Sequence, residues 1–113
     1  MKILEKKPSR SFIVGKNKDI KIEDCGSIKL DNNEHITFLT NDKKEWDILK
    51  KDWGYYATPS INDRLRKQGF RCALVKNKRG STYIMLIEQN KINEFDNYIL
   101  HEENHVVMWL DEL

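Results

Sequence analysis

The first half of the chain alternates apolar and polar side chains in short runs. Such runs predict β-strands, because successive side chains of a strand point to opposite faces of a sheet. Gly, Asn and Asp separate the runs and favour tight turns, so we expect an antiparallel meander. The expected strands are 11–14, 20–23, 27–30, 35–40 and 45–49. The expected turns are Gly15-Lys16-Asn17-Lys18, Asp24-Cys25-Gly26, Asp31-Asn32-Asn33 and Asn41-Asp42.

The pattern changes in the second half, where the segment 60–68 has three signals of a helix. Thr58 is a candidate N-cap, Pro59 stands at the first helical position, and Gly69 follows the last one. Hydroxyl caps, an early proline and a terminal glycine are typical of helix ends. We therefore expect a helix of two to three turns here.

Two further β-rich runs, 70–76 and 82–88, predict a hairpin through the turn 77–80. Apolar residues at helical spacing predict a second helix from Lys91 to about Glu103, with Asn90 as its cap. A closing strand follows at 105–110, and it could pair across a dimer if it lies at a sheet edge. The fold predicted is α+β: a mainly antiparallel sheet, with an N-terminal β-meander followed by α-β-β-α-β, and both helices on one face.

Length and composition support one small folded domain spanning residues 1–113. A net charge of +2 is too small for a histone-like nucleic-acid binder, and 10% aromatic content is too high for an acidic disordered chain. The N-terminus lacks the apolar stretch of a secretory signal, and the longest apolar run, 83–87, is far too short to span a bilayer. We expect a cytoplasmic protein whose two cysteines are free thiols.

Charge is distributed unevenly along the chain. Residues 42–79 hold eleven basic against five acidic side chains, whereas residues 80–113 hold one basic against seven acidic ones. The basic stretch is interleaved with aromatic residues, a combination that suits phosphate contacts and base or sugar stacking. The alternative is that the two segments neutralise each other as an ordinary solvated surface.

The segment 52–65 is the strongest candidate for a binding site, because aromatic residues crowd around Gly54 just before a predicted helix N-terminus. Such an N-terminus presents free N–H groups and partial positive charge, which favour a phosphate or carboxylate. Arginines would add charge, tyrosines stacking area and an asparagine a directional hydrogen bond. The alternative is that the aromatic residues belong to the core. The predicted ligand-binding residues are Trp53, Tyr55, Tyr56, Thr58, Asn62, Arg64, Arg66 and Arg71.

Two other patterns resemble catalytic sites but favour a structural interpretation. The string His101-Glu102-Glu103-Asn104-His105 matches the zinc-protease motif HExxH, which requires one continuous helix. Asn104 and the β-prone residues after it would place the two histidines in different elements. Cys72 lies in a strand-like run and is more typical of a small buried hydrophobe than of a nucleophile. We expect no catalytic residue, metal ligand or cofactor.

The segment from Lys51 to Leu65, with 70–77 after it, resembles small bacterial proteins from surface-polysaccharide and sugar-modification gene neighbourhoods, a group without a defined activity. The resemblance implies an accessory protein that binds a nucleotide sugar or an enzyme of such a pathway. The leading hypothesis is therefore a non-catalytic protein that recognises a phosphate-bearing small molecule or an acidic partner surface. Two alternatives remain: a nucleic-acid-binding protein that uses residues 42–79, and a sugar-modifying enzyme that uses Asp52, Tyr55 or Asp63 as acid or base.

Overall fold

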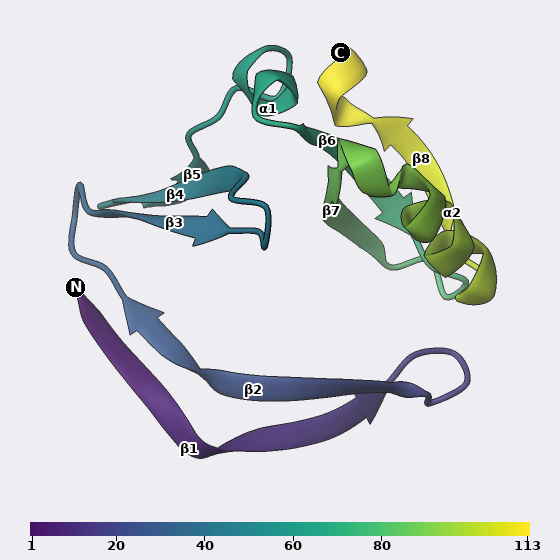
Figure 1. Ribbon diagram of the computed structural model, residues 1–113, viewed down its shortest axis with the longest axis horizontal. Coiled ribbons are helices and arrows are strands. Elements are labelled where there is room, and N and C mark those ends of the chain that lie inside the picture. The colour runs from purple at the N-terminus through teal and green to yellow at the C-terminus, as the bar shows by residue number, and fades with distance from the viewer.

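The protein is a mostly antiparallel β structure with one substantial helix. The computed structural model describes residues 1–113, of which 51% lie in strands. The strands form three separate sheets, which occupy different parts of the molecule (Figure 1). In spatial order these sheets are β1 (Lys2–Val14) and β2 (Ile20–Lys29); β3 (His35–Leu39), β4 (Glu45–Lys51) and β5 (Gly54–Ala57); and β7 (Thr82–Glu88), β6 (Phe70–Lys76) and β8 (His105–Trp109).

The N-terminal hairpin, β1 and β2, is longer than the sequence predicts. The first strand was predicted to start at Ser11, but β1 starts at Lys2. The predicted turn Asp24-Cys25-Gly26 lies inside β2, so both the strand start and the turn were predicted wrongly. Gly26 pairs with Glu5 where the register shifts, and a Cβ at Gly26 would lie 2.1 Å from the carbonyl oxygen of Leu4. This glycine therefore allows a close approach of two strands. In the sequence, a glycine with this role cannot be distinguished from a glycine that marks a turn.

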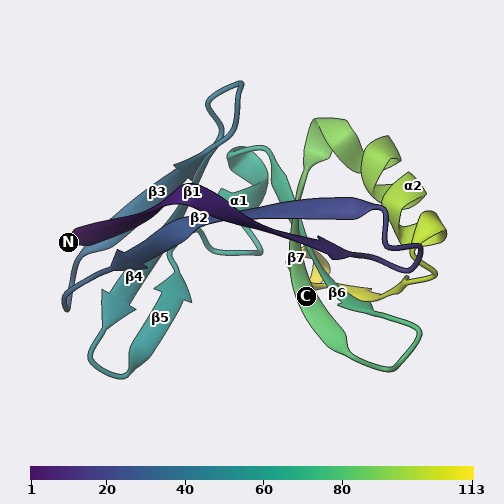
Figure 2. The ribbon, with the colours of Figure 1, turned by 90° about the horizontal axis from the view of Figure 1, so that it is seen from below.

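The N-terminal hairpin crosses the full width of the molecule (Figure 2) and is bonded to the rest only at its two ends. At one end the amino group of Met1 pairs with Glu34 at 3.0 Å. At the other end the loop 15–19 bonds to residues 101–103, at the C-terminal end of the helix α2 (Ile92–His101). The middle of the hairpin makes no hydrogen bond or ion pair outside itself.

The middle sheet confirms the predicted strands 35–40 and 45–49 to within two residues, and adds β5 as an edge strand. The predicted helix 60–68 shortens to a single turn, α1 (Arg64–Lys67). Thr58 does not cap it, since its N–H donates to the carbonyl oxygen of Asp47 and extends the sheet contact. The hydroxyl of Ser60 instead accepts from the N–H of Arg64, and Gly69 follows the helix at φ +93°.

The third sheet confirms the predicted 70–76/82–88 hairpin and the closing strand. The second helix is also confirmed, as α2 preceded by a 3₁₀ turn at Gln89–Lys91, although Asn90 makes no capping bond. β8 lies at a sheet edge, which meets the condition for pairing with a second copy; the dimer itself stays a prediction.

The two helices lie on opposite faces of β6, because alternate side chains of this central strand pack against different partners. Phe70 and Cys72 pack with Leu65 of α1, whereas Ala73 and Val75 pack beneath α2. The predicted placement of both helices on one face was therefore wrong. The antiparallel character of the predicted fold is confirmed, but three small sheets replace the single sheet.

The molecule is open for its size. Its accessible surface is 8333 Å², whereas a compact monomer of this mass exposes about 6,500 Å². Its radius of gyration is 15.7 Å, against about 13 Å for a compact domain of this length. No helix has the length and apolar character needed to cross a membrane.

Candidate functional site

The predicted ligand-binding residues fall into two separate groups in the structure. Trp53, Tyr55 and Tyr56 belong to the β4–β5 turn and to β5, at the end of the middle sheet that lies away from α1 (Figure 1). Arg66 and Arg71 belong to α1 and β6 on the other side of the connecting segment. The structure therefore does not bring the aromatic residues and the arginines together.

The first group is an exposed aromatic surface, which we call the aromatic tip: Lys50, Lys51, Trp53, Tyr55 and Tyr56. The three aromatic side chains are 69%, 57% and 45% exposed, respectively, so the alternative that they form core is wrong. The rings of Trp53 and Tyr56 stack with centroids 6.1 Å apart and planes 13° apart. Tyr55 points to the opposite face of the sheet, where Lys50 Nζ lies 5.5 Å from its ring centroid.

The two lysines of the aromatic tip form no ion pair. Lys50 Nζ donates to the carbonyl oxygen of Lys51 and, at 3.4 Å, to Asn32 Oδ1. Lys51 Nζ donates to Asn33 Oδ1 at 2.7 Å. These acceptors are neutral, so they orient the ammonium groups without cancelling their charge. The aromatic tip therefore combines stacking surface with two ammonium groups that form no ion pair.

The second group is a buried ion-pair cluster around Asp111, whose side chain is fully enclosed. Its carboxylate accepts hydrogen bonds from Arg66 Nε at 2.7 Å, Arg71 Nε at 3.1 Å and the backbone N–H of Cys72 at 3.1 Å. Burial by itself raises the pKa of Asp111, but these hydrogen bonds outweigh it and hold the pKa below its ordinary value. Arg71 also stacks on Trp109, 3.9 Å from the ring centroid. Through their bonds to Asp111, Arg66 and Arg71 hold the C-terminal segment against α1 and β6.

The remaining predicted ligand residues lie between the two groups. Arg64 is 3.7 Å from Asp47, Asn62 is exposed, and Thr58 is half-buried with its N–H in the sheet contact described above. The helix that would have presented free N–H groups to a phosphate is only four residues long. The predicted anion site at a helix N-terminus therefore has no structural basis.

The basic stretch 42–79 is partly neutralised by the acidic C-terminal third, as the alternative interpretation proposed. Four basic residues pair with acidic ones beyond residue 80. These pairs are Lys44 with Glu88, Arg66 with Asp111, Arg71 with Asp111 and Glu112, and Lys78 with Glu103. The lysines of the aromatic tip are among the basic residues of this stretch that stay free of ion pairs.

A second site, which we call the Asp19 cluster, joins the loop 15–19 to the end of α2. Asp19, His101 and Glu102 bring three potential ligand atoms within 4.8 Å of one another. His105 lies in β8, so the predicted separation of the two HExxH histidines into different elements is confirmed. Sequence reasoning missed this cluster, because no local pattern connects Asp19 with residues 82 positions away.

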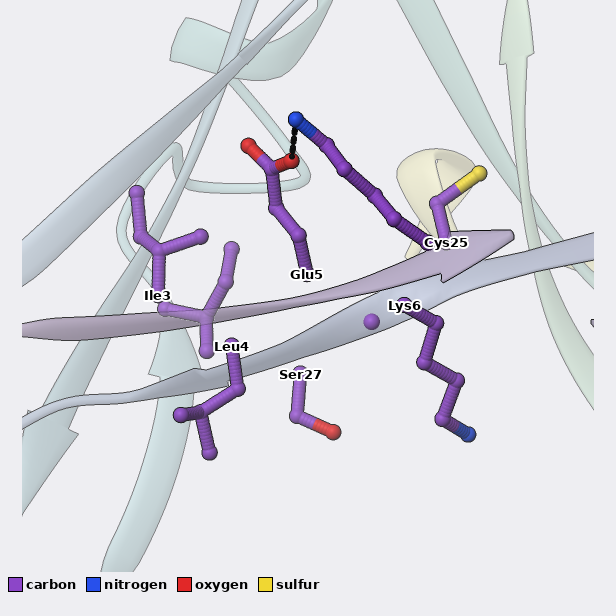
Figure 3. Close-up of a pocket in the computed structure, with 9 residues that line it drawn as sticks. Ile3, Leu4, Glu5, Lys6, Cys25 and Ser27 are labelled. Carbon is purple, nitrogen blue, oxygen red and sulfur yellow. Dashed lines mark ion pairs between the residues drawn. The ribbon is translucent and has the colours of Figure 1, made fainter. Parts of the chain in front are cut away.

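The N-terminal hairpin also has an open concavity of about 490 Å³ at its bend. Ile3, Leu4 and Ile28 contribute apolar surface, and Glu5 pairs with Lys7 at 2.8 Å beside them (Figure 3). Cys25 lines the same concavity and is exposed. The concavity has no enclosed polar group that would orient a ligand.

Comparison of the chain with protein-family models, curated proteins and solved structures found no match.

Proposed function

We propose that the protein is a non-catalytic binding protein whose aromatic tip recognises a phosphate-bearing small molecule of the nucleotide-sugar class. The observation that carries the proposal is the exposed Trp53–Tyr56 stack, with Lys51, which forms no ion pair, on the same face of the sheet as Tyr56. The choice of a nucleotide sugar within the larger class of ring-bearing phosphates rests on the sequence resemblance described above.

The exposure of the aromatic side chains supports a ligand-stacking role. Burying an aromatic side chain removes about 150–250 Å² from water, so a fold gains little by leaving three of them on one four-residue strand and its turn. Exposed apolar patches of this kind mark binding surfaces. The ring of Trp53 or Tyr56 offers a flat face to a nucleobase or to the apolar face of a sugar.

The lysines would supply the phosphate contacts that sequence analysis assigned to arginines. A lysine ammonium binds phosphate as a point charge and donates up to three hydrogen bonds. Lys51 lies opposite Gly54 in the β4–β5 register, where the absence of a side chain leaves open space beside it. Arg66 and Arg71 are committed to Asp111 and leave the proposed contact set.

The aspartates of the segment 52–65 support a binding role more than a catalytic one. Asp63 pairs with Lys67 at 2.9 Å, both side chains being exposed, and Asp52 stands in the open β4–β5 turn. A general acid or base works best in an enclosed position from which water is excluded. Neither aspartate has such surroundings.

A ligand panel with matched tyrosine variants tests the proposal. Thermal unfolding is followed with nucleotides and nucleotide sugars, since a ligand at 100 times its Kd stabilises the folded state by about 2.7 kcal/mol. Tyr56→Ala should weaken binding about tenfold, the effect of losing one stacking contact of about 1–3 kcal/mol. Tyr83→Ala is the control, because Tyr83 is similarly exposed, at 48%, on a different sheet. Absence of a shift with every panel member would overturn the proposal.

Salt dependence separates this function from nucleic-acid binding. An oligonucleotide held through several phosphates loses affinity steeply with added salt, because releasing its counterions into a saltier solution gains less free energy. A small ligand with one or two phosphates should lose much less over the same range. Tight, steeply salt-dependent binding of single-stranded oligonucleotides through Trp53 and Tyr56 would show that the aromatic tip is a nucleic-acid-binding site.

A further inference from the structure

The Asp19 cluster lies where the N-terminal hairpin meets α2. His101 Nε2 is 3.0 Å from Asp19 Oδ2 and 3.5 Å from Glu102 Oε2. Asp19 belongs to the loop between β1 and β2, whereas the other two residues end α2. The three side chains therefore connect segments that are far apart in sequence and that share few other bonds.

Glu102 is the unusual member of the Asp19 cluster, because its side chain is 93% buried and only half satisfied. Its Oε1 accepts the backbone N–H of Lys16 at 2.8 Å, while its Oε2 is buried without a hydrogen-bond partner. A buried carboxylate oxygen without a partner is costly, and such oxygens are normally paired or bound to a metal ion. This oxygen faces His101 within the cluster.

The spacing of the ligand atoms fits a small divalent ion. With metal–ligand bonds of about 2.0 Å, two ligand atoms of a tetrahedral site lie about 3.3 Å apart. The two separations from His101 Nε2, 3.0 and 3.5 Å, lie on either side of that value. One imidazole nitrogen and two carboxylate oxygens suit Zn²⁺ and similar transition metals better than Mg²⁺ or Ca²⁺, which prefer oxygen ligands alone.

We propose that Asp19, His101 and Glu102 form a binding site for a divalent transition-metal ion of the Zn²⁺ class, which fastens the N-terminal hairpin to α2. Three protein ligands leave a fourth position for water. His105 takes no part, so the site differs from the HExxH arrangement in both ligand set and geometry. A bound metal ion would coordinate the buried Oε2 of Glu102 and neutralise the negative charges of Asp19 and Glu102.

The alternative to a metal ion is a proton on His101, since an imidazolium would also pair with both carboxylates. The two cases differ in their response to added metal. A Zn²⁺ site should bind one equivalent, raise Tm and slow amide exchange in the loop 15–19. A purely protonic cluster should show none of these effects.

Titration of the full chain with Zn²⁺ tests the site, with calorimetry and amide hydrogen exchange as readouts. Asp19→Ala is the main variant, because Asp19 is exposed in a loop and its loss should leave the fold intact. It should weaken Zn²⁺ binding by about 100-fold or more, since loss of an outer-shell partner alone costs about 10–100-fold. His101→Ala should have a comparable effect, while His105→Ala, the matched control, should bind as the wild type does.

Three results would overturn the proposal. The first is no stoichiometric Zn²⁺ binding near neutral pH. The second is binding that survives Asp19→Ala unchanged. The third is binding that His105→Ala abolishes, which would assign the metal to the HExxH histidines.

Discussion

The C-terminal unit, residues 59–113, buries many of its apolar side chains, whereas the N-terminal hairpin leaves most of its apolar side chains exposed to solvent. Every buried residue except Leu30 lies in the C-terminal unit, and the hairpin contains none. β6 is covered on both faces, whereas β1 is exposed along its whole length. Burial therefore stabilises one region, while the other depends on its own backbone ladder and on its two attached ends.

The N-terminal hairpin therefore contributes exposed apolar surface to a molecule whose total accessible surface is large for its mass. The N-terminal hairpin exposes Ile3, Leu4, Ile13 and Ile28, which alternate imperfectly and reach both faces of the ribbon. A two-stranded ribbon without a cover is marginally stable in water. The accessible surface of the molecule exceeds that of a compact monomer by about 1,800 Å². This excess is larger than the roughly 800 Å² that each partner buries in a standard protein–protein interface.

The two cysteines should show the largest contrast between the regions. Burial, with Asp111 nearby, raises the pKa of the Cys72 thiol, whereas Cys25 is exposed on the hairpin. We expect a thiol reagent to modify Cys25 at once and Cys72 about a thousandfold more slowly, because Cys72 reacts only when the sheet opens. Time-resolved mass spectrometry measures both rates. Cys25→Ser should remove the fast phase alone, and two fast phases would contradict the contrast.

A matched pair of leucine truncations should show the next largest effect. Leu65→Ala empties a position that is 1% exposed and should lower the free energy of unfolding by about 3 kcal/mol. Leu4→Ala removes the same atoms from a position that is 50% exposed and should cost about 0.5 kcal/mol or less. Urea unfolding measures both variants. A larger cost for Leu4→Ala that grows with protein concentration would show that a second copy covers the hairpin.

The buried carboxylate of the C-terminal unit should give the smallest of the three effects. Asp111→Asn keeps one oxygen for Cys72 but loses the charge between Arg66 and Arg71, and should destabilise the protein by about 2 kcal/mol at pH 7. Because the folded-state pKa of Asp111 lies below its unfolded value, its stabilisation is present above about pH 4 and is lost as the pH falls further.

The pH dependence of the stability difference between wild type and Asp111→Asn tests whether the charge of Asp111 is the cause. The difference in stability between wild type and Asp111→Asn should shrink as urea unfolding is repeated from pH 7 down to about pH 3. Asp24→Asn on the hairpin is the comparison. The pKa of Asp24 is also lowered, mainly by its hydrogen bond from Lys6, but the side chain is only half-buried on an open hairpin and its partners are exposed, so its removal should change stability little. A difference for Asp111 that stayed constant with pH would contradict the assigned cause.

Local patterns predicted the strands β3, β4, β6, β7 and β8 and the helix α2, because their periodicity and turn residues agree with their packing. The same reasoning failed at Gly26, where a glycine serves a close approach, and at Thr58, where the backbone joins a sheet before a helix can begin. The candidate site divided for a related reason. Arg66 and Arg71 follow Tyr56 by only 10 and 15 residues, but Asp111, forty or more residues later, holds them elsewhere.

The sequence alone determined the antiparallel character, the 70–76/82–88 hairpin and the buried role of Cys72, because these follow from side-chain alternation and turn chemistry within a few residues. Tertiary structure decided the rest. It placed the helices on opposite faces of β6, left Trp53 exposed and its neighbouring lysines without ion pairs, and joined Asp19 to His101. These outcomes depend on which distant groups meet, and a long-range contact is chosen by the packing of the whole chain rather than by any local preference.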